Sequence, residues 1–184
     1  MVLVSQATPA DCRAAAEVRM EAAKLYRPRV VRLLLIAQMP PDELDRYFYF
    51  ENVPTADHLF RAVVPHLLGE DPARLDKRQQ LAALRDQGVF IIDLKPDPCD
   101  PKPVRAFVPD LVARARELGP EHAILVKVDV YDAAFEALRD AGIAVVDERI
   151  PFPSTGRQTE FAGRFRNALM RAGLPDHSGV VGES

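Results

Sequence analysis

Polar residues that could do chemistry follow directly on two apolar runs of the chain. Gln38 comes after the run 30–37, and Asp93 stands near the end of the run 89–94. A carboxylate accepts hydrogen bonds, so Asp93 could bind a ligand with adjacent N–H groups, act as a catalytic group, or cap the end of a strand. The Gln38 amide could hold a water molecule by hydrogen bonds, but it cannot act as a base.

A third candidate lies towards the C-terminal end, where Ser154, Thr155, Gly156 and Arg157 precede a predicted helix. Free backbone amides at the helix N-terminus, two hydroxyl groups and a guanidinium could together bind an anion. Further basic residues follow at helical spacing and could extend this face: Arg164, Arg166 and Arg171. The alternative is ordinary helix capping with a solvated basic face.

Other kinds of chemistry are not indicated. Cys12 and Cys99 match no metal-ligand spacing, and helix capping explains Asp129 and Asp132. The chain has no glycine-rich phosphate loop and no Gly-x-Ser-x-Gly elbow. The sequence therefore predicts neither a metal nor another cofactor. A net charge of -3 argues mildly against strong non-specific binding to nucleic acid.

Composition and termini favour a soluble, cytoplasmic protein. Cys12 and Cys99 are expected to be free thiols, as is usual in a reducing compartment. The first residues lack the basic and apolar segments of a signal peptide, and no run approaches the roughly 18 apolar residues of a membrane span. No membrane partner is expected, and a monomer is favoured.

The elements that must position these residues alternate along the chain. Continuous apolar runs predict strands that are buried on both faces of a sheet, at 30–37, 89–94, 123–129 and 143–148. Amphipathic segments predict helices at 8–26, 55–69, 75–87, 103–118, 130–142 and 158–172. The pattern indicates one α/β domain over 1–175, with a central four-stranded, mainly parallel sheet and a flexible tail at 176–184. In such sheets ligands bind beyond the carboxyl ends of the strands.

The loops at those strand ends resemble, in their order, the motifs of the uracil-DNA glycosylase superfamily. The strand that ends in "AQMPP" is similar to the first motif, and "GVFIIDL" is similar to the family's "GVLLLN" strand. "ILVKVDVYDAAFEALRDAGI" resembles its late strand-helix unit, and "PFPSTGRQTEFAGRF" resembles the "HPSP" loop with the helix after it. The resemblance covers about residues 28–170.

This resemblance implies a three-layer α/β/α sandwich whose pocket receives a base flipped out of DNA, since the glycosidic bond cannot be reached inside a stacked duplex. One of Phe48, Tyr49 or Phe50 would stack on the base, or these aromatics would instead pack the loop onto the core. Ser154, Thr155 and Arg157 would meet the DNA backbone. The family's iron–sulfur members need four cysteines, so no cluster is expected from the two present here.

The chain departs from the family at the positions that matter for hydrolysis. Met39 stands where the family has a water-positioning Asp or Asn, and Gln38 stands where some branches have a carboxylate. Phe152 replaces the histidine of the last motif, and Asp93 replaces the asparagine that reads uracil. We therefore expect a divergent member that binds a base, nucleotide or DNA without the standard activity on uracil. Two alternatives remain open: a glycosylase for another base that uses Asp93 or Gln38, and a non-catalytic protein-interaction domain.

Overall fold

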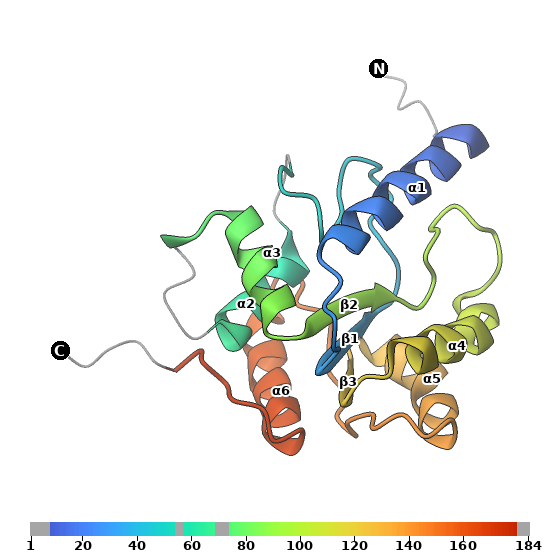
Figure 1. The fold of residues 1–184 in the computed structure, drawn as a ribbon. Coiled ribbons are helices and arrows are strands. Elements are labelled where there is room, and N and C mark those ends of the chain that lie inside the picture. Colours follow the sequence, from blue (N-terminus) through green and yellow to red (C-terminus); the bar gives the residue numbers. More distant parts are fainter. Residues whose placement is uncertain (1–7, 54–56, 69–73, 180–184) are drawn as a thin grey trace.

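The protein contains a parallel three-stranded sheet with helices on both sides (Figure 1). The computed structural model describes residues 8–53, 57–68 and 74–179. The strands run in the order β2-β1-β3, with bounds β1 Leu33–Ala37, β2 Val89–Asp93 and β3 His122–Leu125. In this register Leu33 of the central strand pairs with Val89 on one side and with His122 on the other. The predicted α/β class with parallel strands is confirmed.

The helices alternate with the strands and flank the sheet. Their bounds are α1 Pro9–Leu25, α2 His58–Leu67, α3 Lys77–Asp86, α4 Val108–Leu118, α5 Val128–Asp140 and α6 Gln158–Arg171, with a 3-10 turn η2 at Val104–Phe107. Helices α2, α3 and α6 lie on one side of the sheet, and α4 and α5 lie on the other (Figure 1). Thr8 and Asp11 form the capping box that starts α1. The predicted start of the second helix at Thr55 lies outside the described residues.

The predicted fourth strand at 143–148 is not formed. The segment 143–150 runs beside residues 123–126 but pairs with them only at two separate bridges, Ala123 with Val145 and Val126 with Ile150. Between the two bridges the chain advances three positions on one side, from Ala123 to Val126, and five on the other, from Val145 to Ile150. Two residues of the second segment therefore bulge out of the ladder. Two amides of this segment also donate to carbonyls only two residues back along the chain. These local turns take up donors that a continuous ladder needs.

The central strand β1 is buried along its whole length, as its continuous apolar run predicts. β2 lies at the edge of the sheet, where unpaired backbone groups need other partners. The Tyr49 hydroxyl accepts a hydrogen bond from the Ile91 amide at 2.7 Å and donates to the Ile91 carbonyl at 3.2 Å. Arg114 donates to the carbonyls of Asp93 and Leu94 at 3.0 and 3.1 Å. Side chains therefore cover this edge.

Cys12 and Cys99 form a disulfide, so the expectation of two free thiols is wrong. The two Cα atoms are 6.2 Å apart although the residues are separated by 87 positions in the sequence. The bond joins α1 to the proline-rich loop that follows β2. Because sequence separation says nothing about spatial proximity, only the packing of α1 beside this loop reveals the pair. The two cysteines therefore give no support for a reducing compartment.

Residues 176–178, which the sequence assigns to a flexible tail, are bound to α2 and α6. The Asp176 carboxylate lies 2.8 Å from His66 Nδ1 and accepts a hydrogen bond from Arg166 at 2.6 Å. Both the amide and the hydroxyl of Ser178 donate to the same carboxylate. The rest of that tail, 180–184, lies outside the described residues. Within the described part of the chain, no helix is long and apolar enough to cross a membrane.

Candidate functional site

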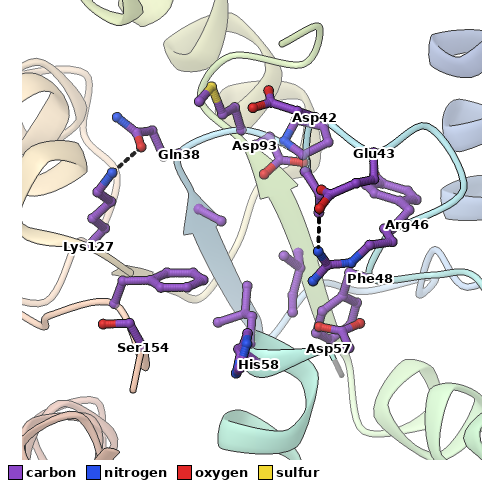
Figure 2. Close-up of a pocket in the computed structure, with 18 of the residues that line it drawn as sticks. Gln38, Asp42, Glu43, Arg46, Phe48, Asp57, His58, Asp93, Lys127 and Ser154 are labelled. Atoms are coloured by element: carbon purple, nitrogen blue, oxygen red, sulfur yellow. Dashed lines mark hydrogen bonds and ion pairs between the residues drawn. The ribbon is translucent and has the colours of Figure 1, made fainter. Parts of the chain in front are cut away.

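A cavity of about 680 Å³ opens at the carboxyl ends of the three strands (Figure 2). Gln38 follows β1 in the lining, Asp93 is the last residue of β2, and Lys127 follows β3. Parallel α/β sheets place ligands at this edge. The volume lies within the roughly 300–1,000 Å³ that is typical of small-molecule sites.

Eight of the ten residues that the sequence singles out line this cavity. They are Gln38, Met39, Phe48, Tyr49, Asp93, Phe152, Ser154 and Arg157. Phe50 and Thr155 are not part of the lining; Phe50 packs edge-on against Tyr47, with the ring centroids 5.5 Å apart. The structure therefore brings loops that are more than 100 residues apart in sequence to one site.

The Asp93 carboxyl is the most perturbed acid of the cavity. Burial raises its pKa to about 7, although the positive charges of Arg114 and Arg19 oppose this shift. No described residue donates a hydrogen bond to the carboxyl. At neutral pH it is therefore partly protonated, and the protonated form both donates and accepts, as an asparagine amide does. A protonated Asp93 can therefore donate as well as accept hydrogen bonds, whereas the carboxylate expected from the sequence only accepts.

Arg19 of α1 binds the loop that follows β1, and nothing in the sequence predicts this role. Its Nη2 atom donates to the carbonyls of Pro41, Glu43 and Arg46 at 2.8, 2.9 and 3.1 Å. The side chain is only 3% exposed, and burial lowers the pKa of its guanidinium. An arginine in an amphipathic helix is normally solvated, so its sequence position gave no signal of this role.

The aromatic residues mainly pack this loop onto the core. Phe48 and Tyr49 are 8% and 4% exposed, and each borders the cavity with part of its ring. Tyr49 stacks on Tyr26 with their ring centroids 6.0 Å apart, and the ring centroids of Phe48 and Phe60 are 5.2 Å apart. This burial counts against an exposed aromatic patch for a protein partner. Tyr47, which is not among the predicted site residues, also lines the cavity, and burial beside the Asp93 charge raises the pKa of its hydroxyl.

Lys127 also lines the cavity, although it is not among the residues predicted from the sequence. The predicted strand 123–129 ends at Leu125, α5 begins at Val128, and Lys127 occupies the junction. Asp129 therefore lies in the first turn of the helix, and the prediction that it caps the helix is wrong. The Lys127 ammonium donates to Gln38 Oε1 (Figure 2). It also lies 3.2 Å from Asp129 Oδ2. A single lysine within "AILVKV" was the available signal.

The predicted anion site and basic face are weaker than the sequence suggests. Ser154 and Arg157 line the cavity just before α6, but the exposed Arg157 guanidinium lies 3.6 Å from Glu160. All three arginines of the predicted basic face pair with an acid, either Glu148 or Asp176: Arg164, Arg166 and Arg171. The cavity wall also carries more acids than bases, with Asp42, Glu43, Asp57, Asp93 and Asp129 against Arg46, Lys127 and Arg157.

Among the residues that the structure describes, no group of three or more His, Cys, Asp or Glu could hold a metal ion. Comparison with known proteins adds no assignment: no protein-family model matches the chain, and no curated protein matches it. The function must therefore be argued from the cavity itself.

Proposed function

We propose that the strand-end cavity binds a nucleobase, free or as part of a nucleotide or DNA, in a divergent protein of the uracil-DNA glycosylase type. The observation that carries this proposal is the position of Asp93. The Asp93 carboxyl lies in a cavity with aromatic walls, and none of the described residues donates a hydrogen bond to it. A planar, polar-edged ring suits such a site, because its faces need apolar contact and its edge needs a few directed hydrogen bonds.

The cavity offers both kinds of contact. Phe48 and Phe152 supply aromatic surface, and Phe152 is 36% exposed, so its ring is accessible to a ligand. Stacking on an aromatic ring is worth roughly 1–3 kcal/mol for each base. Asp93 and Gln38 supply polar groups for the base edge. The mixed charge of the wall favours recognition of a base over tight binding of a long phosphate backbone.

We propose that standard uracil hydrolysis is absent. The thioether of Met39 cannot orient an attacking water, and Phe152 has no proton with which to stabilise a leaving base.

A second function, hydrolysis of a base other than uracil, is favoured by one observation. The pKa of Asp93 is about 7, which is close to the value expected of a general base or acid that works near neutral pH. In this case Asp93 would activate water, and Gln38 would help to hold it.

Two assays on one panel separate these functions. Oligonucleotides carrying uracil, hypoxanthine, xanthine or an alkylated base are tested for binding and, with the protein in excess, for abasic-site formation. We expect binding without base release. Asp93→Ala should weaken binding at least tenfold, whereas Asp140→Ala, at an exposed site outside the cavity, should not. Base release that disappears in Asp93→Ala would establish the hydrolase, and no binding to any member would refute the proposal.

A further inference from the structure

Helix α1 has little apolar contact with the rest of the protein. Only two of its residues are buried, Cys12 and Arg19. Three of its larger apolar side chains, Val18, Met20 and Leu25, are 58%, 53% and 68% exposed. Figure 1 shows the helix apart from α4, α5 and α6. Since helices owe most of their stability to tertiary packing, α1 depends on the few contacts that it does make.

The two halves of α1 are attached in different ways. Near the C-terminal end, Ala22 and Ala23 pack against the core, and the cap residue Tyr26 is buried. In the first half Cys12 is the single buried residue, and its disulfide partner lies in the loop that follows β2. Breaking this bond leaves residues 9–18 without a covalent anchor. A helical segment of about ten residues is marginal in water when nothing holds it.

Arg19 connects the position of α1 to the wall of the cavity. Its Nη2 atom donates to three carbonyls, and the three residues that carry them all line the cavity: Pro41, Glu43 and Arg46. This side chain therefore ties the loop 41–46 to the helix. A movement of α1 that withdraws Arg19 would free three backbone acceptors of the cavity wall at once.

The buried guanidinium of Arg19 is costly to keep in place. Its Nε atom is buried and has no hydrogen-bond partner among the described residues, and an unmet donor costs free energy. Burial also lowers the pKa of the group, although the negative charge of Asp93 opposes that shift. Once α1 is free to move, Arg19 can reach water and satisfy all of its donors, so its hold on the loop weakens.

Solvent reaches the disulfide from one side. Cys12 is 6% exposed, whereas Cys99 is an exposed residue of its loop. A thiolate of a dithiol can attack Cys99 Sγ; the bond between the two cysteine sulfurs then breaks, and Cys12 leaves as a thiolate that takes up a proton. The second thiol of the reductant attacks the mixed disulfide and releases Cys99. Two electrons thus pass to the cysteine pair, and the dithiol becomes a disulfide.

We propose that the Cys12–Cys99 disulfide is a redox switch that controls how firmly the cavity wall is held. When a dithiol reduces the bond, residues 9–18 of α1 loosen, Arg19 leaves its three carbonyls, and the loop 41–46 gains freedom. Reoxidation restores these contacts. The switch acts on the cavity wall whatever ligand the cavity takes, so this inference goes beyond the proposed function and does not rest on it.

Backbone NMR relaxation and amide shifts, recorded before and after reduction with dithiothreitol, test the switch while both forms are folded. These measurements report order in the native state, which a mere loss of stability does not change. Alkylation of the untreated protein should find neither cysteine free. On reduction, order parameters for 9–18 should fall from about 0.85 to below about 0.6. Amide shifts of 42–46 should move, and those of β1, β2 and β3 should stay.

Two arginine variants of the same helix separate the coupling from the loosening of α1. In Arg19→Met the loop 42–46 should show the shifts of the reduced state before any reductant is added. Reduction should then loosen 9–18 without moving the loop further. Arg13→Met, at an exposed position, should respond to reduction as the wild type does. The double variant Cys12→Ser/Cys99→Ser should match the reduced wild type and ignore dithiothreitol; if it does not fold, the arginine pair still decides.

Several results would overturn the inference. Free thiols in the untreated protein would show that no bond forms, and unchanged order parameters for 9–18 after reduction would show that the bond does not hold α1. Loosening of α1 with unmoved shifts at 42–46, or an equal loop response in Arg19→Met and the wild type, would remove the coupling to the cavity. Complete unfolding of the reduced protein, or shifts throughout the sheet, would make the bond a structural support and not a switch.

Discussion

Replacing Asp93 with asparagine should stabilise the protein, and the gain should be larger at pH 8 than at pH 4.5. Burial raises the Asp93 pKa from 3.8 to about 7, so the folded state holds a proton that the unfolded chain releases. The stabilisation that protonated Asp93 gives the folded state is fully present below about pH 4, and it is lost as the pH rises through about 7. The difference between 3.8 and about 7 corresponds to roughly 4 kcal/mol, at about 1.4 kcal/mol for each pKa unit. An asparagine side chain at this position stays neutral and avoids this loss.

Urea unfolding of both proteins at the two pH values measures the effect. Because the carboxyl borders a cavity that solvent can enter, we expect a gain of about 2–4 kcal/mol for Asp93→Asn at pH 8 and about 1 kcal/mol at pH 4.5. Asp176 titrates in both proteins, so its contribution cancels. The exposed Asp140→Asn should show no such pH dependence. An equal gain at both pH values, or a loss at pH 8, would refute the reasoning.

Three further predictions concern the contacts that hold the site in place. Reducing the Cys12–Cys99 bond, which spans 87 positions, should cost about 4–5 kcal/mol by chain entropy and lower the Tm by about 10–18 °C in calorimetry with a dithiol; an unchanged Tm would contradict this. Tyr49→Phe removes the hydroxyl partner of the Ile91 backbone in the edge strand, so it should lower the free energy of unfolding in urea by about 1–3 kcal/mol. An unchanged free energy of unfolding would refute this role of the hydroxyl. The contacts of Asp176 lower its pKa, so its stabilisation is present above about pH 4 and is lost in acid. Asp176→Asn should therefore destabilise the protein more at pH 7 than at pH 3, and an equal effect would count against the network.

Elements with a strong local signal could be predicted from the sequence. The unbroken apolar run of β1 predicts a strand buried on both faces, and all five of its residues are buried. Gly88 predicts the end of the helix over 75–87; its φ is 80°, and a Cβ there would lie 2.9 Å from the Val30 carbonyl oxygen. Residues 143–146 are apolar like β1, although Asp147 and Glu148 follow them, but local turns and a two-residue bulge decide the conformation of this segment instead. The composition of the segment does not show that local turns will replace a continuous ladder of strand hydrogen bonds.

The site was predictable where a residue's position along a strand decided its role. Gln38 and Asp93 lie at strand ends, so the topology of a parallel sheet alone places them together. Arg19 and Lys127 depend on tertiary contacts instead: one reaches three carbonyls of a distant loop, and the other meets Gln38 across 89 positions. The same holds for the disulfide. Residues of this kind carry no periodic signal, because their partners are chosen by packing.

The most direct test of the base-binding function is a nucleoside titration followed by backbone amide shifts in the NMR spectrum. Inosine and uridine are the probes, and Asp93→Ala is the matched variant. We expect saturable shifts confined to the cavity loops at 37–43, 93–95, 126–129 and 151–157, and their loss in Asp93→Ala. Shifts elsewhere on the protein, or none at millimolar nucleoside, would contradict a base-binding site at the strand ends.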